Sequence, residues 1–313
     1  MTNRVCLITG GAGFIGQHLV NALLHDGWAV KIIGRSPISN QILDGSVEYH
    51  SGSFGDLGIL RKVMPGVTLL VHLASTTTPA KAYGRSAFDV ESNLIGTLNL
   101  LEEAVRSNVD RVVFPSSGGT VYGKVIKTPI TEKHSTRPIS SHGIIKLAIE
   151  NYIQMLSHEK GLNYTILRIS NPYGPGQRAD STQGVIAVMA GKILRNQPVV
   201  IWGDGSIVRD FLYIDDLVRA FISSINSDAA INQIFNIGVG QGIAINDVLS
   251  ILVRATNKNP EVRFESSRGF DVPVNVLNIT KSNKLLNWSP SVSLDVGINR
   301  TIAWLEQTIR SEQ

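Results

Sequence analysis

The chain has 313 residues, a length that favours one large domain with a smaller second lobe. Its composition, 43% hydrophobic and 17% charged, is ordinary for a globular protein. Its net charge of +4 arises from 29 Lys and Arg against 25 Asp and Glu, spread without the basic runs typical of nucleic-acid binding. A single cysteine, Cys6, excludes a disulfide framework and a cysteine-based metal cluster, and no apolar run approaches the roughly 18–20 residues that span a membrane. We therefore expect a cytoplasmic protein without a metal site and without nucleic-acid or membrane partners.

The first half of the chain alternates short apolar runs with amphipathic stretches, as parallel strands covered by helices on both faces do. The predicted strands are Val5–Thr9, Ala29–Ile33, Val47–His50, Leu69–Leu73, Arg111–Phe114 and Tyr164–Ile169. The predicted helices between them lie near Phe14–Asp26, Leu57–Val63, Phe88–Ser107 and Ser141–Lys160. This alternation predicts an α/β fold with a Rossmann-like, doubly wound parallel sheet.

The pattern changes at Asn171. Residues 171–176 are rich in Pro and Gly and predict a turn cluster outside regular structure. The elements predicted beyond it are helices near Gly184–Arg195, after Asp215, near Ile245–Thr256 and near Leu294–Gln307, and strands at Val199–Trp202 and Gln233–Ile237. We expect a dinucleotide-binding domain of residues 1–170 and about 207–238, and a smaller substrate lobe of residues 171–206 and 239–313.

A glycine-rich turn, Thr9–Gly16, follows the first predicted strand and opens a helix. It fits both GxGxxG and GxxGxxG. Glycines allow a tight turn and a close approach of the backbone to a pyrophosphate, while the helix N-terminus offers free N–H groups and the positive end of its dipole. The turn predicts a bound nicotinamide dinucleotide, held by Gly10, Gly13, Phe14, Ile15 and Gly16.

The second strand lacks the acidic residue that binds the ribose hydroxyls of NAD. It ends Ile33-Gly34-Arg35-Ser36, and an arginine at this place suits the 2′-phosphate of NADP. The local pattern thus favours NADP through Arg35. The alternative is an exposed arginine, with NAD held by other groups.

Many ordered motifs in this chain match one family. Beyond the glycine turn they are His72-Leu73-Ala74, Asn93 with Gly96-Thr97, Ser116–Gly123, Lys146, Asn171–Pro175, Gly203–Gly205, Arg209–Phe211, Asp215-Asp216, and Arg268 with Asp271. From about Arg4 to Trp288 the chain resembles the extended short-chain dehydrogenases/reductases of the NAD-dependent epimerase/dehydratase type. It is most similar to bacterial UDP-glucose and UDP-N-acetylglucosamine 4-epimerases that serve surface polysaccharide synthesis. The resemblance implies NAD as cofactor and further cofactor contacts from Ser53, Leu73, Ala74, Asn93 and Lys146.

The resemblance also implies a catalytic helix. In the family a Tyr and a Lys four residues apart share one helix face; the Lys binds the nicotinamide ribose and lowers the pKa of the Tyr, which takes the proton of the sugar 4-hydroxyl as hydride leaves C4. Here the lysine is Lys146, but the tyrosine position holds His142. Three interpretations stay open. His142 is itself the base, because imidazole titrates near neutral pH; or it impairs the enzyme, because its shorter side chain stops short of the sugar; or the protein only binds.

A second proton-relay hydroxyl precedes the Val-Tyr-Gly of the family. The matching position here is Gly118, so Ser117 or Thr120 is expected to substitute, with Ser117 preferred because it directly follows the strand. The alternative is that these hydroxyls only cap the loop backbone.

The same region indicates the reaction. Gly119 and Thr120 replace the Asp-Glu pair of the family's 4,6-dehydratases, and Cys6 lies in the wrong place for a C3/C5 epimerase. The resemblance therefore implies 4-epimerisation by transient oxidation at C4 and re-reduction on the other face. An NADP-dependent 4-keto-sugar-nucleotide reductase and an inactive nucleotide-sugar-binding protein remain as alternatives.

The substrate residues that the resemblance implies are Asn171, Val200, Trp202, Arg209, Arg268, Asp271 and Asn275. Arg209 and Arg268 would bind the diphosphate of a UDP-sugar, since guanidinium groups match anionic oxygens, and Asn171 would bind a diphosphate or sugar oxygen. Val200 and Trp202 match the strand that contacts uracil, and Asp271 the contact to the uridine ribose. At Asn275 a large Tyr restricts family members to glucose and galactose, so the smaller Asn favours UDP-GlcNAc and UDP-GalNAc.

Family members commonly form homodimers by packing two helices of each subunit into a four-helix bundle. The corresponding helices here are the one that carries Lys146 and the one near Phe88–Ser107. Apolar positions such as Leu147, Ile149, Ile153 and Leu156 fit such an interface or the protein core equally well.

Overall fold

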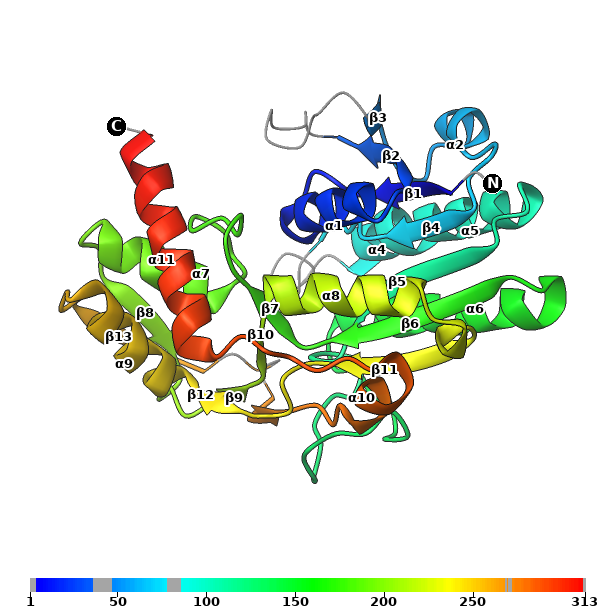
Figure 1. The fold of residues 1–313 in the computed structure, drawn as a ribbon. Helices are drawn as coiled ribbons and strands as arrows, with labels where there is room; N and C mark the ends of the chain where they lie inside the picture. The colour runs from blue at the N-terminus through cyan, green and yellow to red at the C-terminus, as the bar shows by residue number, and fades with distance from the viewer. Residues whose placement is uncertain (1–3, 36–46, 78–85, 268, 270–271, 312–313) are drawn as a thin grey trace.

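Seven parallel strands form the central sheet of the computed structural model, which describes residues 4–35, 47–77, 86–267, 269 and 272–311 (Figure 1). In spatial order they are β11 (Gln233–Ile237), β6 (Asn163–Ile169), β5 (Arg111–Ser117), β4 (Leu69–His72), β1 (Val5–Thr9), β2 (Ala29–Gly34) and β3 (Val47–Ser51). Every neighbouring pair is parallel. The strand order reverses between β1 and β4, where open α/β sheets bind their ligands at the carboxyl ends of the strands. The predicted fold class is confirmed.

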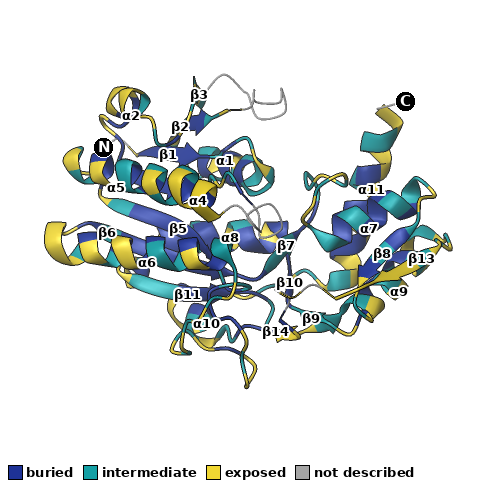
Figure 2. Ribbon diagram, turned by 180° about the vertical axis from the view of Figure 1, so that it is seen from behind, coloured by how far each residue is buried: buried dark blue, intermediate teal, exposed yellow. Residues whose placement is uncertain are grey.

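Helices cover both faces of this sheet (Figures 1 and 2). On one face α1 (Phe14–His25) packs against α8 (Ile214–Ile225), and on the other α5 (Gly96–Arg106) packs against both α2 (Leu57–Val63) and α6 (Ser141–Lys160). Successive residues of a strand point to opposite faces. Accordingly, Cys6 and Ile8 of β1 belong to the core under α1 and α8, whereas Val5 and Leu7 belong to the core under α2, α5 and α6. Both faces of β1 are buried, which explains its unbroken apolar run.

Two predicted segments differ from the structure. The helix predicted near Phe88–Ser107 consists of α4 (Ser86–Asp89), a π-helical turn η1 (Val90–Ile95) and α5. The first half of the predicted turn cluster is a short strand, β7 (Asn171–Tyr173), which pairs in parallel with β10 (Phe211–Tyr213). The prediction of no regular structure was wrong for these three residues, because their order comes from pairing with a strand forty residues away. The turn itself begins at Gly174.

The second lobe gathers α7 (Val185–Leu194), α9 (Ile245–Thr256) and α11 (Leu294–Ser311) around small sheets. β8 (Val199–Trp202) pairs with β13 (Val262–Glu265), and β9 (Val208–Arg209) lies between β12 (Ile243–Ala244) and β14 (Val274–Asn275). A 3-10 turn (Asp228–Ala230) precedes β11, and α10 (Thr280–Leu286) packs on β11. The exact division into two domains remains a prediction.

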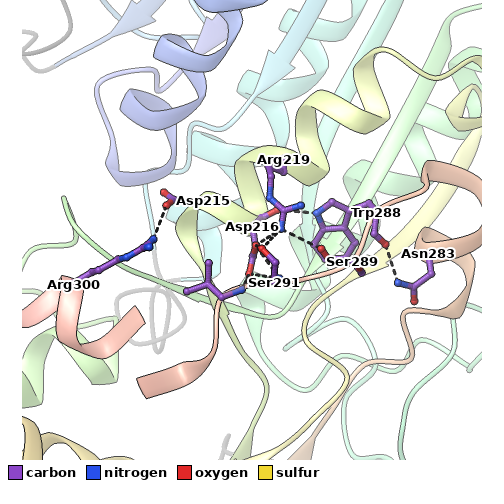
Figure 3. Close-up of polar contacts among 9 residues, drawn as sticks. Asp215, Asp216, Arg219, Asn283, Trp288, Ser289, Ser291 and Arg300 are labelled. Carbon is purple, nitrogen blue, oxygen red and sulfur yellow. Dashed lines mark hydrogen bonds and ion pairs between the residues drawn. The ribbon is translucent and has the colours of Figure 1, made fainter. Parts of the chain in front are cut away.

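A buried carboxylate on α8 fastens the chain between α10 and α11 (Figure 3). Asp216 accepts hydrogen bonds from the backbone N–H groups of Ser291, at 3.1 Å, and Val292, at 3.0 Å, and from the guanidinium of Arg219. The indole of Trp288 donates to the carbonyl oxygen of Asp216 at 3.0 Å. These contacts hold the segment that leads into α11 against the sheet domain. None of the helices in the described ranges is long and apolar enough to cross a membrane.

Candidate active site

The glycine turn after β1 has a shape that only glycines permit. Gly10 has a φ of 75°, and a Cβ there would lie 2.9 Å from the backbone nitrogen of Ala74. A Cβ at Gly16 would lie 2.5 Å from the carbonyl oxygens of Gly10 and Gly11, so the first turn of α1 packs directly on the loop. Gly13 begins the helix without a side-chain cap, which leaves the first N–H groups of α1 for another partner. This cradle fits a pyrophosphate.

The end of β2 offers an arginine and no carboxylate. The hydroxyl of Tyr49 donates to the carbonyl oxygen of Gly34 at 2.8 Å, and a Cβ at Gly34 would lie 3.1 Å from that hydroxyl. Tyr49 therefore fills the space beside the strand end. Arg35 is exposed, and the hydroxyl of the exposed Ser53 accepts a hydrogen bond from the N–H of Gly55 at 3.3 Å.

His142 and Lys146 lie one turn apart at the start of α6. The helix begins there because the hydroxyl of Ser140 caps it, accepting from the N–H of Gly143 at 3.3 Å. The Lys146 ammonium donates to the carbonyl oxygen of Pro115 at 2.8 Å. His142 and Lys146 line a cavity at the carboxyl edge of the sheet together with His72, Ala74, Asp89 and Asn93. The structure thus brings the two predicted catalytic residues together.

Burial sets the charge of both groups. Burial lowers the pKa of Lys146 to about 8, and the carboxylate of Glu150 opposes this change. Burial also lowers the pKa of His142 to about 4; the nearby ammonium of Lys146 contributes, and the carboxylate of Asp89 acts in the opposite direction. At pH 7 His142 is therefore neutral and Lys146 is mostly charged.

Asp89, which the sequence pattern did not single out, connects three segments around this cavity. Its buried carboxylate accepts hydrogen bonds from the side chains of Thr77, at 2.6 Å, Asn93, at 2.8 Å, and Ser141, at 2.6 Å. The other amide atom of Asn93, Oδ1, accepts from the N–H of Thr76 at 2.8 Å. Asn93 therefore holds the segment after β4 in place. The only sequence signal for Asp89 was an acidic residue on the buried side of a predicted helix.

The loop after β5 carries the two candidate relay hydroxyls. A Cβ at Gly118 would lie 2.6 Å from the Cδ1 atom of Leu277 and 3.1 Å from the carbonyl oxygen of Arg168, so the hydroxyl residue of the family pattern would fit here only if Leu277 shifted. Ser117 is partly exposed at the end of β5, and the hydroxyl oxygen of Thr120 is buried without a hydrogen-bond partner in the described structure. Both stay candidates.

Short strands of the second lobe carry the predicted substrate residues. The side-chain amide of Asn171 donates to the carbonyl oxygen of Asp210 at 3.0 Å. The guanidinium of Arg209 donates to the carbonyl oxygen of Val272 at 2.7 Å. Val200 is partly buried on β8, and Trp202, on the same strand, is 42% exposed. The predicted residues Arg268 and Asp271 lie outside the described residues.

Asn275 joins the two lobes. It pairs with Arg209 in the register of β14 and β9 and is 1% exposed. Its Nδ2 atom donates to the carbonyl oxygen of Gly118 at 3.0 Å, whereas its Oδ1 atom is buried without a partner among the described residues. A buried acceptor of this kind normally has a donor, and the contact of Nδ2 with Gly118 places it beside the loop that follows Ser117.

A protein-family model decides what this arrangement is. The model of the NAD dependent epimerase/dehydratase family matches residues 6–238, a range that contains the glycine turn, His142, Lys146 and Arg209. The chain belongs to the NAD-dependent epimerase/dehydratase family. The predicted family resemblance is confirmed.

Two curated relatives are similar to this chain over almost the whole length of both proteins. A putative UDP-glucose 4-epimerase of Methanocaldococcus jannaschii is 32% identical over 97% of this chain and 99% of its own. A dTDP-4-dehydro-6-deoxyglucose reductase of Escherichia coli is 31% identical over 95% of this chain and 96% of its own. The relatives thus include both an epimerase and a keto-sugar reductase.

Solved structures agree with the family. A UDP-glucose 4-epimerase of Thermotoga maritima with UDP-glucose has a TM-score of 0.93 and 34% identity, covering 97% of this chain and 99% of its own. A UDP-glucose 4-epimerase of Thermus thermophilus in complex with NAD has a TM-score of 0.89 and 31% identity, covering 96% and 99%. The family is NAD-dependent and this second structure holds NAD, which confirms the prediction of a nicotinamide dinucleotide cofactor.

Proposed function

We propose that this epimerase/dehydratase binds a UDP-hexose and interconverts it at C4, at a rate limited by His142. The observation that carries the proposal is the pair His142 and Lys146, one helical turn apart in a cavity at the carboxyl edge of the sheet. The glycine cradle lies at the same edge, after β1. A nicotinamide cofactor bound there would supply the hydride chemistry of the reaction.

Each side chain has a distinct task in this proposal. Lys146, mostly charged at pH 7, would donate hydrogen bonds to the nicotinamide ribose, and Ser117 or Thr120 would hydrogen-bond the sugar 4-hydroxyl. Neutral His142 accepts the proton of that hydroxyl. A base with a pKa of about 4 accepts a proton poorly at pH 7, because general-base catalysis is best with a pKa near the working pH. The imidazole is also shorter than a phenol, and misplacement by about 1 Å costs rate steeply.

Replacing His142 by Tyr tests this directly. We expect His142→Tyr to raise kcat by roughly 10²-fold or more on UDP-GlcNAc or UDP-glucose, since a positioned general base contributes about 10²–10⁴-fold. The amount of bound cofactor should stay the same. The exposed His25 on α1 supplies the control His25→Tyr, which should change neither quantity. Fast turnover by the unchanged chain, with no gain in His142→Tyr, contradicts the proposal.

Asn275 supports a substrate with an N-acetyl group at C2. It is smaller than the tyrosine of the glucose-specific pattern, and the smaller side chain leaves room for such a group. We therefore infer that UDP-GlcNAc and UDP-GalNAc are the preferred pair, bound also by Asn171, Val200, Trp202 and Arg209, with Arg268 and Asp271 as further predicted contacts.

A second candidate function is an NADP-dependent reductase of a 4-keto-sugar nucleotide. The exposed Arg35 beside a strand end without a carboxylate favours it, and the reductase of E. coli is among the relatives. Denaturing the purified protein and identifying the released cofactor distinguishes the two functions, as does NADPH-dependent reduction of a 4-keto sugar. Binding of UDP-sugars without turnover in either form at position 142 would instead identify a binding protein.

We infer a homodimer from exposed apolar residues on α4, η1 and α6, the helices of the predicted dimer interface. Of the four apolar positions on α6 with two possible roles, Ile149, Ile153 and Leu156 belong to the core, and Leu147 is partly buried against a smaller cluster. The exposed apolar residues on α4, η1 and α6 are Phe88, Val90, Ile95, Ile144, Tyr152 and Met155. Two copies packed by these faces would cover them. Light scattering on a sizing column measures the mass that tests this inference.

A further inference from the structure

A buried ion pair lies directly behind the candidate catalytic residues. Glu150 is on α6 one turn beyond Lys146 and is fully buried. Arg168 of β6 donates from Nε to both carboxylate oxygens, at 3.1 and 3.2 Å, and from Nη2 to Oε2 at 2.6 Å. The hydroxyl of Ser116, on β5, also donates to Oε1. A buried carboxylate needs such partners, and two neighbouring strands of the sheet supply them to Glu150.

The ion pair contacts both ends of one loop. Ser116, the last but one residue of β5, lies just before the loop and binds Glu150. At its other end the Nη1 of Arg168 donates to the hydroxyl of Tyr122 at 3.0 Å, and this hydroxyl donates to Oδ1 of Asn236 at 2.7 Å. Burial raises the pKa of Tyr122 to about 12, so the hydroxyl keeps its proton. The candidate relay residues Ser117 and Thr120 lie between these two fixed points.

The same strand end also holds Lys146. Pro115 accepts the hydrogen bond of the ammonium, and the next residue, Ser116, binds Glu150. The titratable groups around Lys146 are Glu150 and His142 on α6 and His72 on β4, with Asp89 on α4 acting on His142. Glu150 is the anion among them that favours the charged ammonium, against the effect of burial.

We propose that Glu150 and Arg168 form a positioning pair that fixes both ends of the loop Ser116–Tyr122 against α6, and with it the placement of Ser117 and Thr120 relative to Lys146. The value of this placement for catalysis rests on the proposed function. The placement itself does not, since it follows from the contacts of four buried side chains. Glu150 and Arg168 lie outside the set of described residues that line the cavity, so both act through other residues.

The test compares Glu150→Gln with a matched control, Glu103→Gln. Glu103 is likewise buried and paired with an arginine, Arg106, at 2.5 Å, but lies near the end of α5 that leads into the start of β5. Two measurements need no activity. The first is the pH titration of the Lys146 Cε resonance in protein labelled with ¹³C-lysine, assigned by its loss in Lys146→Arg. The second is hydrogen exchange of the loop amides of Gly118, Thr120 and Val121, each of which donates to a backbone carbonyl.

We expect Glu150→Gln to lower the pKa of Lys146 by about one unit, which is a tenfold loss of proton affinity, and to speed exchange of the loop amides about tenfold. Glu103→Gln should change neither. Equal behaviour of the two variants in both measurements overturns the proposal. If Glu150→Gln does not fold, Ser116→Ala and Tyr122→Phe serve instead, because each removes one contact and keeps the ion pair. Each variant should speed amide exchange at its own end of the loop. Unchanged exchange in both variants also overturns the proposal. If Glu150→Gln speeds loop exchange as expected but the unchanged chain has no epimerase activity, only the proposed function is contradicted.

Discussion

The glycine turn and the first turn of α6 lie at the same edge of the sheet but depend on different parts of the chain. The glycine turn works through backbone atoms, and its requirement at Gly16 is the absence of a side chain. The turn of α6 works through the side chains of His142 and Lys146, whose charges depend on burial and on neighbouring groups. We therefore expect cofactor binding to depend on the shape of the backbone, and the proposed turnover to depend on the reach and pKa of single side chains.

The largest expected effect concerns the glycine turn, which works through backbone atoms. In Gly16→Val the new Cβ would lie 2.5 Å from two carbonyl oxygens, so α1 must move away from the turn. We expect NAD affinity to fall by roughly 100-fold or more, equivalent to about 2.7 kcal/mol. Titration calorimetry with NAD measures it. The exposed Gly58 in α2 gives the control Gly58→Ala, which should bind NAD normally; normal binding by Gly16→Val would contradict the prediction.

A second prediction concerns the titration of His142 in the first turn of α6. The pKa of His142 is about 4 in the folded chain and near 6.5 in an unfolded one, so between these values the unfolded chain binds more protons. The folded state therefore loses stability as the pH falls from about 6.5 toward 4. His142→Gln should remove on the order of 2 kcal/mol of the difference in unfolding free energy between pH 7.5 and pH 5.

Urea unfolding at the two pH values measures this effect, with His25→Gln as an exposed control. Burial also lowers the pKa of His72, to about 3, so part of the acid sensitivity should persist in His142→Gln. An unchanged difference in that variant would mean that His142 titrates normally in the folded protein.

The smallest expected effect concerns Arg35 and its contribution to the affinity for NADP. Arg35 is exposed, and solvent screens its interaction with a phosphate. Arg35→Ala should weaken NADP binding by about tenfold at most and leave NAD binding unchanged, as measured by fluorescence titration with both reduced cofactors. Arg61→Ala, an exposed arginine on α2, is the control. Equal losses for both cofactors would place Arg35 away from the 2′-phosphate.

The elements that could be predicted are those whose signal is local. β1 is apolar on both faces, so the strand follows from adjacent residues. The resemblance to the family singled out His142 and Lys146, and their spacing places them on one helix face. β9, β12 and β14 have two residues each, too few for any periodicity, and exist only through pairing. The tight space at Gly118 depends on Leu277, and the partners of Glu150 come from β5 and β6. Such features arise from distant segments and leave no mark in a local pattern.

The position of β11 has a consequence for how the chain is made on the ribosome. β6 ends at Ile169, but its neighbour β11 begins only at Gln233, after the first elements of the smaller lobe. During synthesis the edge of β6 that later pairs with β11 therefore has unpaired N–H and C=O groups until more than sixty further residues have been added. An open edge is a template for pairing with another chain, so the nascent chain passes through a stage in which it is prone to aggregate before β11 completes the sheet.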